Sequence, residues 1–345
     1  MAGGKRFGIV VAGLSLLLVV LVVANILTGS VDIPSDDVIS VLKGEEGVKN
    51  TYKIIILETR IPMLLTAMLA GMALSVAGLL LQTVFNNALA DPSILGVSTG
   101  ASLGVALVML TVGTAFGSTF GASAGGYISM LAGAFIGAFA VLFILLIFSS
   151  VVKSNTMLLI IGILVSYLTS SAISFLNFFS TQEGVHSYVI WGLGSFSGVT
   201  NSELPVFAAV IFASLVWALL MVKPLNAMLL GTRYAANLGV NVKSVRNQLL
   251  VITGLLTAVV TAFCGPIGFI GLVVPHIARL LLNTSNHNRL LPVTMLSGAV
   301  VTLLCTFVSV LPSNGILPIN AITPVIGVPI ILYIILNRRK IPYFN

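Results

Sequence analysis

The sequence predicts an all-α, polytopic membrane protein that forms a single domain over residues 1–345. Of these residues, 58% are hydrophobic and only 7% are charged, whereas soluble domains carry roughly 25% charged residues. The mean hydropathy of +1.14 agrees with this excess. Apolar runs of about 20 residues, the length that crosses a bilayer as a helix, recur along the whole chain.

Ten transmembrane helices are expected from these runs. The first run follows Lys5 and Arg6 and is too long, with no convincing cleavage site before Asp32, for a signal peptide. The spans lie near residues 7–28, 60–85, 93–112, 126–150, 156–179, 204–222, 247–264, 267–283, 291–311 and 319–337.

The distribution of charge orients the chain. Ten crossings put both termini on one side of the membrane, and on that topology twelve Lys and Arg residues lie on that side against four on the other. Cytoplasmic loops carry the excess of Lys and Arg, so both termini are expected in the cytoplasm. Asp91 is the only carboxylate expected on the inner side. The net charge of +7 is explained by this orientation, and no nucleic acid is expected as a partner.

Several segments between the spans carry turn or cap signals. The outer loop 29–53 should hold a short surface helix with Ser35 as its N-cap. A second short outer helix is expected within 181–202, and 113–126 reads as a flexible outer loop. On the inner side, Asp91 predicts a helix cap rather than a catalytic or ion-binding group, because Pro92 follows in the first turn. The third span should therefore begin at a fixed point on the inner side.

Gly265 and Pro266 interrupt an apolar run between the seventh and eighth spans. Lipid cannot satisfy the backbone groups freed by such a break, so they must pair within the protein or meet water. We expect these two spans to form a hairpin with its tip outside. Close helix packing is predicted where small residues recur at four-residue spacing, as at Ala67, Gly71, Ser75, Gly133 and Gly137.

A cationic stretch, residues 223–248, separates the sixth and seventh spans. It contains four Lys or Arg residues and no Asp or Glu, which predicts a cytoplasmic location. Two short helices are expected in it, from Asn226 to Leu230 and from Arg233 to Leu238, separated by Gly231. A pair of short helices on the inner face is suited to holding a partner.

The sequence lacks the motifs of an enzyme. No GxxxxGK[ST] phosphate loop occurs, so the chain is not expected to hydrolyse ATP by itself. The three histidines, His186, His276 and His287, are far apart and give no metal-ligand spacing. No metal or cofactor is expected, and His276 is interpreted as a packing or capping residue.

No Asp or Glu lies in the middle of a predicted span. Buried carboxylates are the usual marks of proton-driven carriers, so that class is disfavoured. Sodium coupling through unwound backbone carbonyls needs no carboxylate and stays open. Transport without an internal energy source needs an external drive, and the stretch 223–248 is the place where it would act.

Four stretches together resemble the FecCD or BtuC-type permeases, the membrane subunits of ATP-driven importers for iron–siderophore complexes, haem and cobalamin. The resemblance covers nearly the whole chain and implies a BtuC-like type II ABC importer fold in a bacterial inner membrane. The stretches are Arg60-Ile61-Pro62 with Gly71 and Gly78, Gln82 with NNALADPSILGVSTGA, LLGTRYAANLGVNV, and GPIGFIGLVVPHIARLL with Arg289-Leu290-Leu291-Pro292.

The resemblance implies an assembly of two permease copies, two cytoplasmic ATPase subunits and an outer substrate-binding protein, surrounded by lipid. It implies that paired coupling helices contact the ATPase through Leu230, Gly231, Arg233, Ala235, Leu238 and Gly239. It also implies structural or pathway roles for Gln82, Asn87, Asp91, Pro92, Gly96, Gly100, Gly265, Pro266, Gly268, Pro275 and His276.

The chain departs from the family pattern on the outer side. Met63 stands where the pattern has a second Arg, and Ile316 to Asn320 stand where it has Glu-Leu-Pro-Ile-Gly. Family permeases commonly dock their binding protein through outer arginines, so docking here is expected to rest on Arg60 and Lys53. Arg233 also stands where the pattern has an acidic or polar residue.

The leading hypothesis is an importer permease that translocates a bulky metal chelate, an iron–siderophore complex or haem, by alternating access driven by a separate ATPase. Cobalamin is the alternative cargo within the same family. Two alternatives belong to other classes. One is a sodium-coupled secondary carrier, motivated by the break after Cys264, and the other is a non-transporting scaffold or receptor.

Overall fold

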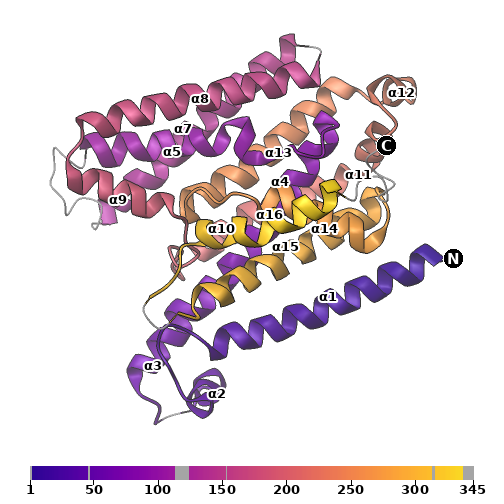
Figure 1. The fold of residues 1–345 in the computed structure, drawn as a ribbon. Coiled ribbons are helices and arrows are strands. Elements are labelled where there is room, and N and C mark those ends of the chain that lie inside the picture. Colours follow the sequence, from indigo (N-terminus) through magenta and orange to yellow (C-terminus); the bar gives the residue numbers. More distant parts are fainter. Residues whose placement is uncertain (1, 46, 113–123, 153, 313–314, 337–345) are drawn as a thin grey trace.

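The computed structural model describes residues 2–45, 47–112, 124–152, 154–312 and 315–336. These residues are mostly helical, and none of them forms a strand. Most of the predicted outer loop 113–126 lies outside them. Figure 1 shows one bundle, with the start of α1 (Ala2–Leu27) at the same end as α11 (Val222–Met228) and α12 (Thr232–Asn237).

Each of the ten predicted spans overlaps an apolar helix, which confirms the all-α polytopic fold. Among the described residues, six helices are long and apolar enough to cross a membrane, a bent pair is a seventh candidate, and three apolar helices are shorter. The long helices are α1, α4 (Ile61–Phe85), α7 (Ala124–Val151), α8 (Asn155–Phe179), α13 (Val242–Cys264) and α15 (His287–Ser309). The bent pair is α10 (Leu204–Leu220) with α11, at 55°. The shorter helices are α5 (Val97–Leu107), extended by the π-helical turn η3 (Val108–Val112), α14 (Ile270–Leu282) and α16 (Ile319–Leu336).

The central helix of the bundle is α4. It continues α3 (Asn50–Ile54) and the π-helical turn η1 (Ile55–Arg60), and it packs against α15, α13, α14 and α10. Nearly every residue of α4 is buried. The sequence explains this position, because Ala, Gly and Ser recur among its leucines and let neighbouring helices approach closely.

Glycine pairs set the distance between α4 and its neighbours. A Cβ added at Gly78 would lie 1.9 Å from the carbonyl oxygen of Gly271 in α14, and one at Gly71 would lie 2.3 Å from that of Gly298 in α15. The helices therefore touch through their backbones, and the close packing predicted at Gly71 is confirmed. The same kind of contact joins α5 to α7, at Gly104 with Gly133 and at Gly100 with Gly137.

The short helices predicted outside the bundle are present. The helix α2 (Ser35–Lys43) buries Val38 against Ile56 of η1. The prediction that Ser35 is its N-cap is wrong, because Ser35 is the first helical residue and Pro34 precedes it without a side-chain cap. The helix α9 (Gln182–Gly192) begins after Thr181, whose Oγ1 accepts a hydrogen bond from the Gly184 N–H at 3.2 Å. Both lie away from the end that carries α11 and α12 (Figure 1).

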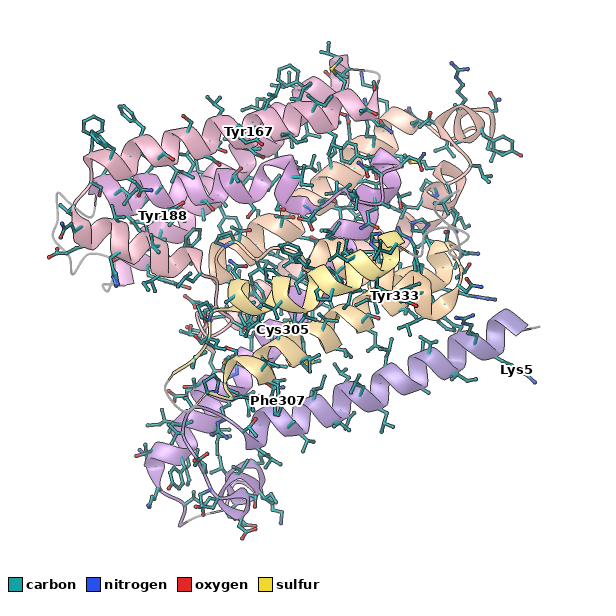
Figure 2. The ribbon with its side chains drawn as sticks, viewed as in Figure 1. Lys5, Tyr167, Tyr188, Cys305, Phe307 and Tyr333 are labelled. Atoms are coloured by element: carbon teal, nitrogen blue, oxygen red, sulfur yellow. The ribbon has the colours of Figure 1, made fainter. Side chains whose placement is uncertain are left out.

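Helices at the periphery of the bundle expose large apolar side chains. Tyr167 on α8 and Tyr333 on α16 are 71% and 62% exposed (Figure 2). An apolar surface of this extent is expected where lipid or another subunit covers the protein. Cys264 and Cys305 are buried and are not joined by a disulfide.

We expect Gly78→Ala to lower the thermal unfolding midpoint of the detergent-solubilised protein. The added methyl group would force α4 and α14 apart, and overpacking of this kind costs about 1–3 kcal/mol. Gly13→Ala in α1 is the matched control, because a Cβ there meets nothing within 4 Å. Equal midpoints for the two variants would contradict the backbone contact.

Candidate functional site

The predicted cytoplasmic stretch folds as two short helices, which we call the α11–α12 element (residues 222–239). Gly231, with φ +98°, separates the helices, and Gly239, with φ +85°, follows the second. Glycine adopts such φ values without steric cost. Both predicted short helices are therefore present, although the first begins at Val222 instead of Asn226.

The α11–α12 element exposes large apolar side chains in its second half, from Leu230 onward, whereas Leu225 and Met228 of α11 are buried. Leu230, Tyr234 and Leu238 are 63%, 53% and 58% exposed, whereas Ala235 is fully buried. Tyr234 in α12 and Leu238, which directly follows the helix, are four residues apart and therefore lie on one face. Arg233 is exposed beside them. An apolar face with a cation at its rim has the composition of a protein-binding surface.

Arg246 is buried just beyond the α11–α12 element. Its guanidinium donates to the carbonyl oxygen of Ser149 and, at 3.0 Å, to that of Val152, both at the C-terminal end of α7. It also donates to Asn155 Oδ1 in α8 at 3.2 Å, and Asn155 donates to the Val84 carbonyl of α4. These contacts satisfy carbonyls that a helix end leaves free. They tie α13 to α7, α8 and α4.

The segment between α4 and α5 carries the predicted cap. Asp91 Oδ1 accepts the Ser93 N–H at 2.9 Å and caps the 3₁₀ turn η2 (Pro92–Leu95). Pro92 occupies the first position of that turn, where its missing N–H removes no hydrogen bond. Upstream, Asn87 Oδ1 accepts the Leu89 N–H at 2.9 Å. The capping role predicted for Asp91 therefore matches the geometry.

The prediction that the third span begins on the inner side is wrong. Gly96, with φ +83°, precedes α5, and a Cβ there would lie 3.3 Å from Gly162 in α8 and 3.4 Å from Val141 in α7. Asp91 itself is only 6% exposed. The helix α5 thus begins inside the bundle and Asp91 is interior, because the chain enters the protein in a non-helical form that hydropathy alone does not reveal.

Gln82 joins α4 to α14. Its Nε2 donates to the Leu272 carbonyl at 3.3 Å, and its Oε1 accepts from Arg279 Nη1 at 2.6 Å. The buried side chain of His276 also faces Leu272, with Nδ1 2.8 Å from the carbonyl oxygen. Pro275, inside α14, has no N–H for the carbonyl of Gly271. That carbonyl is the one that lies against α4.

The chain unwinds between α13 and α14. Gly265 has φ +77°, and the freed groups that follow it are bound by Asn320 at the start of α16. Asn320 Nδ2 donates to the carbonyls of Gly192, at 3.1 Å, and Pro266, at 2.5 Å, and its Oδ1 accepts the Gly268 N–H at 3.3 Å. The prediction that the protein must pair these groups is confirmed.

The predicted hairpin of the seventh and eighth spans is wrong. Over their described lengths, α13 packs against α7, α4 and α10, whereas α14 packs against α4, α15 and α16. The break therefore sends the chain to the other side of α4. Length and hydropathy mark two helices and a turn here, but they carry no information about which neighbours each helix finds.

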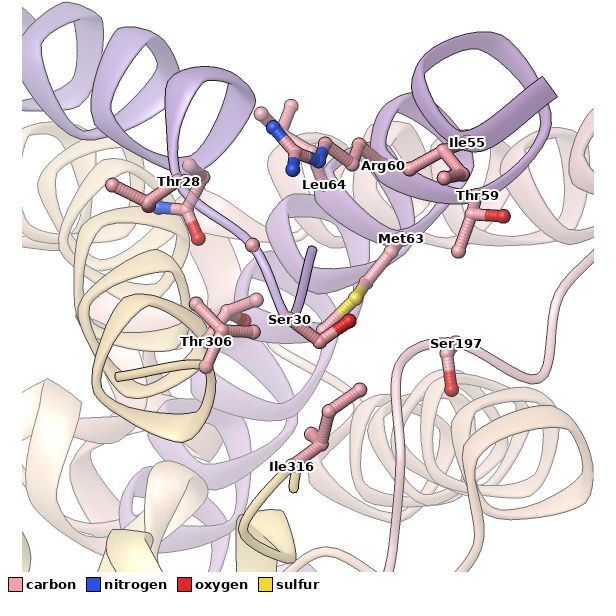
Figure 3. A pocket seen from close by; sticks show the side chains of 13 residues that line it. Thr28, Ser30, Ile55, Thr59, Arg60, Met63, Leu64, Ser197, Thr306 and Ile316 are labelled. Atoms are coloured by element: carbon pink, nitrogen blue, oxygen red, sulfur yellow. The ribbon is translucent and has the colours of Figure 1, made fainter. Parts of the chain in front are cut away.

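Arg60 lies at the end of the bundle opposite α12, beside a pocket of about 60 Å³ (Figure 3). It is only 8% exposed, and its guanidinium donates to the carbonyls of Ile26, Leu27 and Val31 at 2.7, 3.1 and 2.5 Å. It therefore caps the C-terminal end of α1. Its docking role stays a prediction, as does that of Lys53, which is half-buried at the end of α3.

Comparison with known proteins gives the family. The FecCD transport family matches residues 17–337. The chain belongs to this family. It is 34% identical over 330 residues to the vitamin B12 import system permease protein BtuC of Citrobacter koseri, across 95% of this chain and 94% of the relative. BtuC of Klebsiella pneumoniae subsp. pneumoniae is also 34% identical, over 328 residues that cover 95% and 93% of the two chains. A solved metal-chelate type ABC transporter in an inward-facing conformation matches with a TM-score of 0.80 and 30% identity, over 95% and 98% of the two chains.

Membership in the FecCD family confirms the predicted BtuC-like permease fold. The chain is a multi-pass membrane permease of an ABC importer, a class of subunit that is not itself catalytic. The alternative of a sodium-coupled carrier is set aside. The break that motivated it is bridged by Asn320, which binds the Pro266 carbonyl.

Sequence reasoning missed the side chains that stabilise this FecCD chain from a distance. Asn155 was not singled out, and Asn320 was interpreted only as a departure from the family pattern. Arg6 was interpreted only as an inner cation, although it donates to the carbonyls of Leu281 and Leu280 at 2.8 and 3.2 Å. A polar residue next to a break or a helix end was the available signal. This signal identifies a hydrogen-bond donor, but it does not identify the helix that carries the acceptor.

In this FecCD permease, Arg60→Gln should lower the unfolding midpoint, because the end of α1 loses three charge-assisted hydrogen bonds. One hydrogen bond to a charged group contributes about 1.5–3 kcal/mol, and we expect a loss of about 2 kcal/mol or more. Lys53→Gln makes the same change of charge without removing a cap and should shift the midpoint little. An unchanged midpoint together with weakened docking of the binding protein would instead support the predicted docking role.

Proposed function

We propose that this permease works as one of two copies in an ABC importer, with two ATPase subunits bound on the cytoplasmic side and a substrate-binding protein on the outer side. Both termini would lie in the cytoplasm of a bacterial cell, on the side of the α11–α12 element. The surrounding apolar helices would face lipid. ATP hydrolysis would take place on the partner subunits.

The α11–α12 element carries this proposal. It joins the two helices that precede and follow it, α10 and α13, and it exposes Leu230, Tyr234 and Leu238 beyond the bundle. Full burial of an exposed large apolar side chain contributes about 1.5–3 kcal/mol, and a partner would gain part of this from each of the three, which are already partly buried. Gly231 and Gly239 turn the chain tightly at the two ends of α12. An ATPase subunit that bound this face would hold a rigid lever connected to two membrane helices.

We propose a bulky metal chelate as the cargo, with cobalamin as the first candidate. The support is the 34% identity to vitamin B12 permeases over 95% of the chain. Iron–siderophore complexes and haem, the cargo expected from the sequence, form the second candidate. They are supported by the match to a metal-chelate type transporter.

Leu238→Asp should abolish co-purification of the ATPase subunits. The substitution removes an exposed apolar anchor and would bury a carboxylate in the interface, and we expect at least a tenfold loss of affinity, about 1.4 kcal/mol. Asn237→Asp is the matched control, since it adds the same charge to a neighbouring exposed residue without removing an apolar group. Retention of the ATPase by the Leu238 variant would contradict the proposed interface.

ATP-dependent uptake tests the proposed function and its cargo together. Proteoliposomes that hold the permease, its ATPase and its binding protein should accumulate radiolabelled cyanocobalamin when ATP is supplied to the ATPase side, and should not do so with a sodium gradient alone. Ferric hydroxamate and haem are the competing cargoes. Uptake without an ATPase would contradict the importer assignment, and uptake of none of the three chelates would contradict the proposed cargo class.

A further inference from the structure

One buried histidine joins three helices at the inner end of the bundle. His287 is the first residue of α15 and is only 1% exposed. One side of its imidazole faces Asn226 in α11, and the other faces Thr83 near the end of α4. The sequence offered it only as a histidine without metal-ligand spacing.

The hydrogen bonds to Asn226 determine whether Nδ1 of the His287 ring carries a proton. Asn226 Nδ2 donates to Asn286 Oδ1 at 3.2 Å, so the oxygen of the Asn226 amide must face His287. That oxygen accepts the His287 backbone N–H at 2.8 Å and lies 3.1 Å from His287 Nδ1. Because an amide oxygen only accepts, Nδ1 carries a proton and donates it to α11.

The other side of the ring binds α4. His287 Nε2 lies 2.9 Å from Thr83 Oγ1, and the same hydroxyl lies 3.0 Å from the Leu79 carbonyl within α4. Thr83 is 7% exposed. Water has little access to either side chain, so a lost partner would leave a buried polar group unpaired, which is more costly than losing an exposed hydrogen bond.

Further along the bundle, α4 and α15 are already held together. Thr302 Oγ1 of α15 donates to the Ala67 carbonyl at 2.7 Å, and Ser75 Oγ of α4 donates to the Thr294 carbonyl at 3.1 Å. The glycine contact described above joins the same two helices. A displacement of α11 that reached His287 would therefore act on α4 and α15 as a pair.

We propose that Asn226, His287 and Thr83 form the positioning link through which the α11–α12 element moves α4 and α15. This inference rests on the proposed function, in which an ATPase displaces that element. The link is a set of buried, directional hydrogen bonds that joins α11 to α15 and α15 to α4. It transmits a pull as well as a push, which apolar contact alone does not.

Thr83→Val tests the link, with Thr294→Val as the matched control. Both substitutions remove one buried hydroxyl at nearly constant volume. Among the residues that the structure describes, however, the Thr294 hydroxyl bonds only to the Leu290 carbonyl of its own helix. The number of ATP molecules hydrolysed per substrate imported is measured in the complete assembly. We expect a rise of about threefold to tenfold for Thr83→Val, the effect of one net hydrogen bond, and a ratio near that of the wild type for Thr294→Val.

A double-mutant cycle separates the link from a general loss of packing. His287→Ala removes the two hydrogen bonds of the ring, to Asn226 and to Thr83. Adding Thr83→Val to it should therefore raise the number of ATP molecules hydrolysed per substrate no further, whereas independent effects would multiply. His287→Asn retains a donor toward Asn226 and should behave like Thr83→Val.

Multiplying effects, equal ratios for the two Val variants, or an unchanged ratio for Thr83→Val would each overturn the link. Absence of ATP-dependent uptake by the wild-type assembly would instead overturn the proposed function, because every variant is compared with that reference.

Discussion

Every helix that ends inside this bundle leaves backbone groups that lipid cannot satisfy, and the architecture depends on how those groups find partners. The partners come from other helices. Asn320 bridges the break between α13 and α14, and arginine side chains bind the last carbonyls of three helices. These are Arg60 on α1, Arg246 on α7 and Arg6 on α14. The places where helices can end are therefore set by a few polar side chains far away in the sequence.

The need to pair backbone carbonyls also changes how the Lys and Arg residues are interpreted. The excess of Lys and Arg on one side predicts orientation, because cytoplasmic loops are enriched in both residues. Several of these cations are nevertheless used within the protein. Arg246 is 6% exposed and binds α7, where the negative end of the helix dipole favours a cation. Arg233, Lys223 and Lys243 are exposed. The charge that surrounds the α11–α12 element is therefore smaller than the sequence suggests.

The parts of the structure that local patterns determine were predictable. Hydropathy located the spans, Gly231 separated two short helices, and Asp91 with Pro92 marked a cap. The depth of each helix in the bundle and the helices that it packs against were not predictable. A 3.6-residue period shows which face of a helix is apolar, but it does not show where along the bundle the helix begins. The interior start of α5 and the separation of α13 from α14 were missed for this reason. The roles of Arg60 and Asn320 were missed because each contact joins residues distant in the chain.

The glycine contacts and the buried hydrogen bonds between helices constrain different movements. The glycine contacts of α4 with α14 and α15 are close but largely nondirectional, so they hold helices at a set distance without fixing their height. The buried hydrogen bonds fix the position of one helix along the axis of its neighbour. The α11–α12 element has one such anchor at each end, Asn226 with His287 on the α11 side and Arg246 with Ser149 and Val152 on the α13 side. In the proposed function, displacing the element would act on α4 and α15 through the first anchor. It would act on α7 and α8 through the second anchor, which also reaches α4 through Asn155. Helices that were driven through two separate anchors could move by different amounts, as alternating access in the proposed function would require.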